Sequence, residues 1–195
     1  MRKGKLRRTL MRATPIYTER LVLRNIEPGD ANDMYEYASV PEVTKYLLWE
    51  PHVNLDATSG YIRYIQTRYL RGLYADWAVA LKESGKMIGT CGYANIDSGA
   101  NECEIGYVLS PYYRKRGYMT EAVEAVLSLT FETLGFDRAK LRIMDGNADS
   151  CRLAERCGFT LESVIPDELV VKGVPRTLRH YSLTKTEYEN SKGCR

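Results

Sequence analysis

The chain has 195 residues, of which 44% are hydrophobic and 27% charged, a composition typical of a globular protein with one domain large enough to bury a core. No run approaches the ~18 apolar residues that span a bilayer, which argues against a membrane helix. The formal net charge is +3, but residues 1–13 contain six cations and no acid, so the rest of the chain is mildly acidic.

Both ends of the chain are predicted to lie outside the folded domain. Residues 1–13 form a basic tail that lacks the apolar core of a signal peptide, roughly 7–15 residues long. This tail is a flexible start with Met11 as an alternative initiator, an arm that binds nucleic acid or the ribosome, or a transit-like segment. Residues 14–188 are predicted to form one domain, and residues 189–195 a C-terminal tail.

The first half of the chain predicts a strand and two helices followed by a meander. Pro28-Gly-Asp30 caps the first helix, and Glu83-Ser-Gly-Lys86 is a hairpin turn between two strands. Residues 40–56 show no clear period and are rich in aromatic side chains, so they are expected to form a loop over the core. The predicted elements are a strand over 18–26, helices over 28–39 and 55–73, and strands over 76–82, 86–95 and 104–109.

The second half alternates helix and strand. Apolar residues at helical spacing predict a long helix from Thr120 onwards, and Gly158 closes a second, short helix. Lys172-Gly173 is the turn of a final antiparallel pair. The order of the elements predicts an α+β fold, with one mixed sheet and helices packed on its faces. The ranges are 120–134 for the long helix, 138–144 for a strand, 147–157 for the short helix, and 159–171 and 175–184 for the last two strands.

The five cysteines show no C-x-x-C pair, and only two histidines accompany them. This pattern predicts no zinc site or other metal centre. An odd number of thiols without a secretion signal suggests a reducing compartment, so a cytoplasmic location is expected. The cysteines are Cys91, Cys103, Cys151, Cys157 and Cys194.

The segment from Glu104 to Ala122 predicts a strand, a basic turn and the start of a helix. Three cations at residues 114–116 precede Gly117, the one residue here that lets a ligand approach the main chain closely. Thr120 is a good N-cap residue, and the unpaired N–H groups of a helix start favour a phosphate or pyrophosphate. The chain contains neither G-x-x-x-x-G-K-[ST] nor a G-x-G-x-x-G after a strand. A solvated basic turn is the other interpretation of the same residues.

Arg114-x-x-Gly117-x-Met119 resembles the acyl-CoA pyrophosphate loop of the GNAT superfamily of N-acetyltransferases. The family pattern is Arg or Gln, two residues, Gly, one residue, then Gly or Ala, and Met119 departs from its last position. The resemblance extends from about Thr18 to Glu187 and points to the RimJ/RimL branch, which acetylates protein N-termini and also contains small-amine acetyltransferases. The other matching segments are Thr18-Glu-Arg-Leu-Val-Leu-Arg24, Asn147-x-x-Ser150, Glu155-Arg-Cys-Gly-Phe159 and Tyr181-Ser-Leu183.

The resemblance implies a single GNAT-like domain over residues 14–188, with a six- to seven-stranded, mixed and mostly antiparallel sheet flanked by about four helices. It implies acetyl-CoA as the cosubstrate, no metal, and an acceptor pocket bordered by residues 40–56. Backbone N–H groups around Val108 would polarise the acetyl carbonyl. The implied cofactor-binding residues are Val108, Leu109, Arg114, Lys115, Arg116, Gly117, Tyr118, Met119, Thr120 and Asn147.

Acetyl transfer to an amine needs a base for the amine, a stabilised oxyanion and a proton for the sulfur. Glu104 is predicted as the base, since its position is similar to that of the glutamate some family members use. A salt-bridged or exposed glutamate is an equally open interpretation, and Glu102, on the same face of the strand, and Glu168 are further candidates. Many relatives protonate the thiolate with a tyrosine where this chain has Ala154. Ser150 is predicted to take that role, with a helix-start cap as its other interpretation.

The resemblance and these residues together predict an acetyl-CoA-dependent N-acetyltransferase of RimJ/RimL type that works by direct transfer in a ternary complex. A protein N-terminal α-amine, whose pKa is near ~8, is the expected acceptor because it loses its proton more easily than a lysine. One alternative is a small-molecule acceptor such as a polyamine, aminoglycoside or amino acid. Another is a non-catalytic acyl-CoA-binding or ribosome-associated regulator, which the vacancy at Ala154 favours. The basic tail allows ribosome association, no membrane partner is expected, and the sequence leaves monomer and homodimer open.

Overall fold

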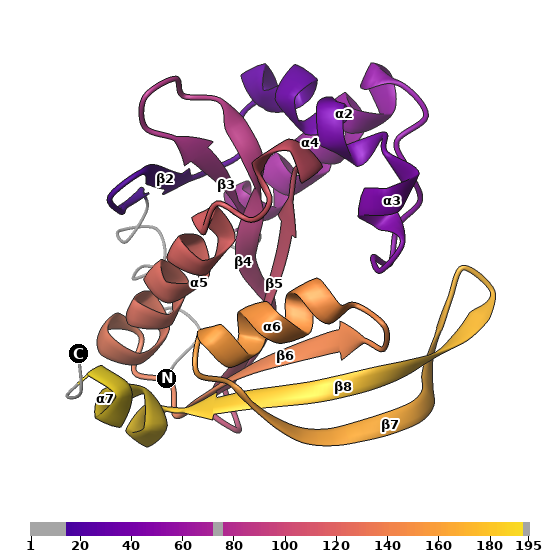
Figure 1. The fold of residues 1–195 in the computed structure, drawn as a ribbon. Coiled ribbons are helices and arrows are strands. Elements are labelled where there is room, and N and C mark those ends of the chain that lie inside the picture. Colours follow the sequence, from indigo (N-terminus) through magenta and orange to yellow (C-terminus); the bar gives the residue numbers. More distant parts are fainter. Residues whose placement is uncertain (1–14, 72–75, 193–195) are drawn as a thin grey trace.

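The computed structural model describes residues 15–71 and 76–192. Its strands form one sheet in the order β1-β2-β3-β4-β5-β6-β8-β7, with helices on both faces (Figure 1). The strands are β1 (Ile16–Tyr17), β2 (Leu21–Arg24), β3 (Asp76–Leu81), β4 (Met87–Asp97), β5 (Glu102–Leu109), β6 (Arg138–Met144), β7 (Thr160–Val171) and β8 (Val174–Thr184). The helices are α2 (Ala31–Ala38), α3 (Pro41–Thr44), α4 (Leu55–Leu70), α5 (Tyr118–Ser128), α6 (Ala148–Arg156) and α7 (Lys185–Lys192), with one short 3₁₀ helix before α2 and another before α5.

The core is divided between the two faces of the sheet, because side chains alternate along each strand. On one face α5 and α6 pack against residues such as Val79 and Ile105. On the other face α2 and α4 pack against the first half of the sheet, where Ala78 and Ile62 are buried. None of the described helices is both long enough and apolar enough to cross a membrane.

The sheet opens between β5 and β6, the one parallel pair of neighbours among the described strands. Their register covers three residue pairs and ends at Glu104 opposite Lys140, although β5 continues to Leu109 and β6 to Met144. Beyond this point β5 rises and β6 runs to the right in Figure 1. The free halves of the two strands therefore diverge, with α5 following one strand along the chain and α6 following the other.

The predicted α+β class and the mixed sheet are confirmed. The sheet has eight strands instead of six or seven, since the two-residue strand β1 is too short for a sequence period to show. Within the described residues, α3 and α7 add to the four predicted helices. Helix α7 runs to Lys192, so the first residues of the predicted tail 189–195 are helical, and the predicted tail 1–13 lies outside the described residues.

Candidate active site

A cleft of about 390 Å³ passes through the opening between β5 and β6. Its strand walls are residues 105–108 and 141–144, the diverging halves of the parallel pair. On one face of the sheet the cleft reaches the start of α6, and on the other it reaches Tyr61 and Arg68 of α4. Two ligands can therefore approach this opening from opposite faces of the sheet.

The main chain of β5 presents hydrogen-bond donors to the opening. The Ser110 amide donates to the Ile88 carbonyl of β4 at 2.8 Å, and main-chain groups alternate in direction along a strand. The Val108 amide therefore points to β4, and the amides of Tyr107 and Leu109 point to the opening. Of the N–H groups around Val108, those of its two neighbours are therefore the ones that face the opening.

The basic loop after β5 ends in a left-handed residue that starts α5. Gly117 has a φ of 80° and is the N-cap, so α5 begins at Tyr118, two residues before the predicted start at Thr120. The first helical hydrogen bond runs from the Glu121 amide to the Gly117 carbonyl at 3.0 Å. By helix geometry, the amides of residues 118–120 lie ahead of this bond and remain for another acceptor. Together with the positive end of the helix dipole, they favour a phosphate group.

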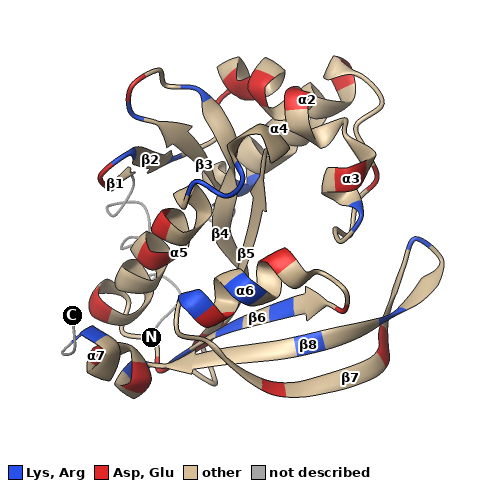
Figure 2. Ribbon diagram, in the orientation of Figure 1, with Lys and Arg blue, Asp and Glu red and all other residues tan. Residues whose placement is uncertain are grey.

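Met119 replaces the small residue of the family pattern without closing the loop. Its side chain is 4% exposed and packs in the core beneath α5, so the outer side of the turn stays open. The side chains of Lys115 and Arg116 are exposed, and Figure 2 shows the basic stretch ahead of α5. The loop therefore combines exposed cations with free main-chain donors.

Arg20 supports this loop, although it is not one of the predicted site residues. Its guanidinium donates to the Arg116 carbonyl at 3.0 Å and to the Glu121 carboxylate at 2.7 Å, and it lies 4.5 Å from the centroid of the Tyr118 ring. Glu121 also accepts a hydrogen bond from the Thr18 hydroxyl at 2.6 Å. The segment before β2 therefore holds both the loop and the first turn of α5 in place through these hydrogen bonds. The matched motif that begins at Thr18 contains Arg20 and could have indicated this residue.

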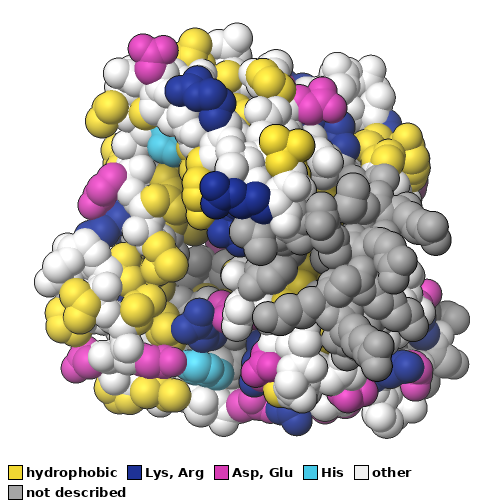
Figure 3. All heavy atoms as spheres, turned by 180° about the vertical axis from the view of Figure 1, so that it is seen from behind, with side chains coloured by type: hydrophobic (Ala, Val, Ile, Leu, Met, Phe, Trp, Pro, Cys, Tyr) yellow, Lys and Arg dark blue, Asp and Glu magenta, His cyan; other side chains and the backbone are white. Residues whose placement is uncertain are grey.

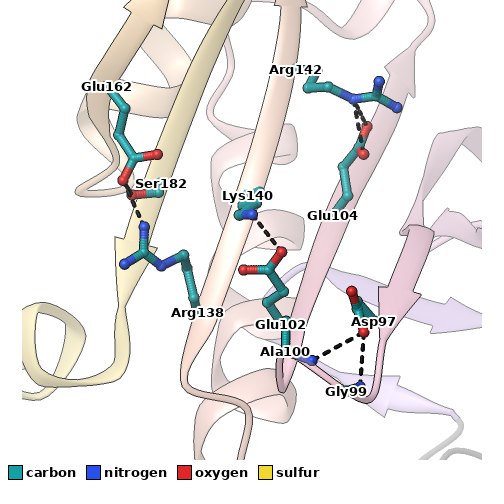
Figure 4. Close-up of polar contacts among 10 residues, drawn as sticks. All are labelled: Asp97, Gly99, Ala100, Glu102, Glu104, Arg138, Lys140, Arg142, Glu162 and Ser182. Carbon is teal, nitrogen blue, oxygen red and sulfur yellow. Dashed lines mark hydrogen bonds and ion pairs between the residues drawn. The ribbon is translucent and has the colours of Figure 1, made fainter.

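Glu104 lines the cleft, but as one half of an ion pair (Figure 4). Both of its carboxylate oxygens accept from Arg142 Nε at 3.0 Å, so the salt-bridged interpretation is the one that the structure shows. Glu102 lies two residues earlier on the same face and pairs with Lys140, and it is not among the described residues that line the cleft.

The third candidate base, Glu168, pairs with His180 of the neighbouring strand. Leu169 beside it lines the cleft, whereas Glu168 is not among the described lining residues. Of the three candidate carboxylates, Glu104 is therefore the one that reaches the cleft.

Asn147 and Ser150 line the cleft at the start of α6. Asn147 is the N-cap, with its Oδ1 accepting from the Ser150 amide at 3.3 Å, so Asn147 has a structural role whatever it binds. Ala154 is fully buried in the core and supplies no proton donor. Tyr107 was not predicted as a site residue, yet it lines the cleft and its hydroxyl donates to the Ser150 carbonyl at 3.4 Å. Burial raises the pKa of this phenol, which keeps it protonated near neutral pH.

The cleft also contains Asp76, which sequence patterns mark only as the first residue of a strand. Burial raises the pKa of its carboxyl group to about 6, and the charge of Arg68 opposes this shift. The residue as a whole is half-buried at the start of β3, while its carboxylate is strongly desolvated. A desolvated carboxylate that faces a cleft is a functional candidate.

Replacing Asp76 with asparagine is expected to stabilise the protein more at about pH 7.5 than at about pH 5. The folded chain keeps the Asp76 proton up to about pH 6, and the unfolded chain releases it near pH ~3.9, so the unfolding free energy falls as the pH rises through this interval. The asparagine variant has no carboxyl group here, so its unfolding free energy does not fall in this way. The unfolding free energy of the variant minus that of the unaltered protein should therefore grow by about 1 kcal/mol between the two pH values. Urea denaturation measures it, with Asp56→Asn, an exposed carboxylate of α4, as the control. An equal free-energy difference at both pH values would contradict the prediction.

Residues 46–49, from the segment with no clear sequence period, form an apolar wall of the cleft together with Tyr61 and Tyr64 of α4. The ring centroids of Trp49 and His52 are 5.2 Å apart, and those of His52 and Tyr61 are 5.8 Å apart. Seen from behind, hydrophobic side chains gather between the helical part at the top and the β7–β8 part at the bottom (Figure 3). Part of the segment that the resemblance gives as a border of the acceptor pocket therefore lines the cleft.

The structure thus combines a sheet that opens between β5 and β6 with a basic loop and a free helix start after β5. A family model described as an acetyltransferase (GNAT) domain matches residues 20–160. The chain belongs to this family and is an N-acetyltransferase, as the resemblance implied.

Relatives and solved structures extend this similarity over most of the chain. An uncharacterized N-acetyltransferase of Bacillus licheniformis, p20, is 33% identical over 173 residues, which cover 89% of this chain and 97% of the relative. The ribosomal protein uS5-alanine N-acetyltransferase of Escherichia coli (strain K12) is 25% identical over 163 residues, covering 80% of this chain and 83% of that protein. The crystal structure of the microcin C7 self immunity acetyltransferase MccE, in complex with acetyl-CoA and AMP, has a TM-score of 0.76 at 21% identity, covering 85% of this chain and 93% of that one. This last likeness is one of fold.

Proposed function

We propose that this N-acetyltransferase transfers the acetyl group of acetyl-CoA to the α-amine of a polypeptide N terminus, within a ternary complex. The cleft through the open β5–β6 pair carries the proposal, because it reaches both faces of the sheet and lets a donor and an acceptor meet. The similarity to the Escherichia coli ribosomal protein uS5-alanine N-acetyltransferase supports a polypeptide as the acceptor.

The residues of the loop and of β5 fit acetyl-CoA. The amides of residues 118–120 and the cations at 114–116 would hold its diphosphate by charge-assisted hydrogen bonds. The amides of Tyr107 and Leu109 would face the pantetheine arm and polarise the acetyl carbonyl, and Asn147 would brace the arm from α6. Acetyl-CoA, when bound, supplies an activated thioester.

Glu104 would accept a proton from the attacking amine, directly or through a water molecule. The nitrogen then bonds to the acetyl carbonyl carbon as the carbon–sulfur bond breaks. The Ser150 hydroxyl would pass a proton to the departing sulfur and regain one from solvent water, with the Tyr107 phenol beside it as a second donor. Since an α-amine has a pKa near ~8, a modest base suffices for this acceptor.

A small-molecule amine is the second candidate acceptor, and the size of the cleft favours it. The same space of about 390 Å³ must hold the acetylated arm and the acceptor. A small amine would be enclosed there, whereas a polypeptide would insert only its first residues and leave the rest of its chain outside.

The test measures free-thiol release from acetyl-CoA with a panel of peptides and small amines. We expect release with peptides that carry a free α-amine, much less with N-blocked peptides that contain lysine, and mass spectrometry should place the acetyl group on the α-nitrogen. Release with small amines alone would move the assignment to the second candidate. Calorimetric binding of CoA with no turnover on any amine would favour the non-catalytic regulator, and no heat with either CoA or acetyl-CoA would overturn the proposal.

A further inference from the structure

Asp76 and two glycines form one row across the sheet. The register pairs Asp76 of β3 with Gly92 of β4, and Gly92 with Gly106 of β5, and residues paired in this way point to the same face. Neither glycine adds a side chain to this row between Asp76 and the opening, and Gly106 lines the cleft. A Cβ atom at Gly106 would lie 3.5 Å from the Ala94 Cβ atom, which is an ordinary contact. Packing alone is therefore not the reason for a glycine at position 106.

Asp76 is the second carboxylate of the cleft, and it differs from Glu104 in its partners and in its proposed role, since Glu104 is assigned to the amine that becomes acetylated. Glu104 already accepts both hydrogen bonds from Arg142. Arg68 donates to the Tyr64 hydroxyl at 3.1 Å and acts on Asp76 through its charge. The Tyr69 hydroxyl donates to the main-chain carbonyl of Asp76, and the causes that shift the pKa of the Asp76 carboxyl group are burial and the Arg68 charge.

Aromatic side chains lie around this carboxylate. Tyr61 and Tyr64 line the same cleft, with ring centroids 6.4 Å apart. Burial is the main cause that raises the pKa of Tyr61, and the charge of Asp76 is the next cause, so the two groups are in electrostatic range. The Tyr37 hydroxyl, on which the same charge acts, is buried with no hydrogen-bond partner in the described part of the chain. A carboxylate among tyrosine rings is suited to an ammonium group, by charge and by cation–π attraction.

Asp76 lies too far from the opening to touch the nitrogen that becomes acetylated. Two strand spacings of ~4.8 Å separate Asp76 from Gly106, roughly 10 Å between Cα atoms, while a reacting nitrogen must come within about 3.5 Å of the thioester carbon. We propose that Asp76 binds a second cationic group of the acceptor, several bonds away from the acetylated nitrogen. The inference rests on the proposed function, because it takes this cleft as the acceptor site.

Two kinds of acceptor offer this chemistry, namely a polypeptide N terminus with a basic side chain beside it and an aliphatic diamine. The test is calorimetric titration of the CoA-saturated protein with two matched pairs: alanyl-lysine amide against alanyl-norleucine amide, and cadaverine against pentylamine. The dicationic member of at least one pair should bind about tenfold to 100-fold more tightly, as a charged hydrogen bond would give. That preference should vanish in Asp76→Asn and persist in Asp56→Asn, and the pair that shows it identifies the source of the acceptor.

Equal affinities within both pairs in the unaltered protein would overturn the inference, and so would an equal loss for both members of a pair in Asp76→Asn. Thermal melting of the variant confirms that it is folded. Because binding is measured without turnover, a preference for dications in a protein that releases no thiol would contradict the proposed function and retain only the binding of a second cationic group by Asp76.

Discussion

Replacing Gly117 with valine is expected to raise the dissociation constant of CoA at least about 100-fold, since two or more charge-assisted hydrogen bonds would be lost. A β-branched residue is a strong outlier at the φ of 80° that Gly117 adopts. The new Cβ atom would also lie 3.4 Å from Arg20 Nη2, on the guanidinium that supports the loop. The chain would leave the left-handed conformation and carry the amides of residues 118–120 with it. Calorimetry with CoA measures the loss.

Gly135 is the matched control for this substitution. It has a φ of 70° with nothing within 4 Å of its missing Cβ atom, so Gly135→Val introduces the same kind of backbone strain without touching the loop. Both variants should melt at lower temperature, but only Gly117→Val should lose CoA. S-acetylpantetheine, which carries the thioester without the diphosphate, should serve both variants equally. Comparable loss of CoA binding in the two variants would make the Gly117 turn a purely structural feature.

Much of the fold could be predicted because its signals are local. Gly158 and the pair Lys172-Gly173 all have positive φ where helix and hairpin ends were predicted, and strand 138–144 has the predicted bounds. The start of α5 was placed two residues late because Thr120 has the side chain of an N-cap, whereas the main chain uses the left-handed freedom of Gly117. A side-chain preference of about 1 kcal/mol is easily overridden by such a turn.

The site was harder to predict because it depends on pairs of residues far apart in the sequence. The loop from Arg114 to Gly117 could be found as a motif. In contrast, the divergence of β5 and β6 has no local signal, since both read as ordinary strands. Arg142 pairs with Glu104 across 38 positions, and Asp76 shares a row with Gly92 and Gly106 only through the pairing of three strands. Composition and spacing can therefore suggest the part of the site that is proposed to bind acetyl-CoA. The part that is proposed to bind the acceptor amine depends on tertiary structure.

Replacing Glu104 with glutamine is expected to lower kcat by about 100-fold to 1,000-fold, the usual effect of removing a general base. The amide keeps the size of the side chain but cannot take a proton from the amine. The KM for acetyl-CoA should change little, because Glu104 lies in the cleft and not in the loop that is proposed to hold the diphosphate. Steady-state rates of thiol release with a peptide acceptor measure both constants.

Two variants separate a base from an ion-pair partner at this position. Arg142→Gln breaks the pair with Glu104 but keeps the carboxylate, so it should retain most of the activity if Glu104 acts as the base. Glu102→Gln removes the neighbouring carboxylate on the same face, which pairs with Lys140 outside the described cleft lining, and should stay within about threefold of the unaltered rate, as for a surface charge. Equal losses in Glu104→Gln and Arg142→Gln would show that the ion pair matters for structure, because the two substitutions share the broken pair and differ in the base. A large loss in Glu102→Gln alone would transfer the role of base to Glu102.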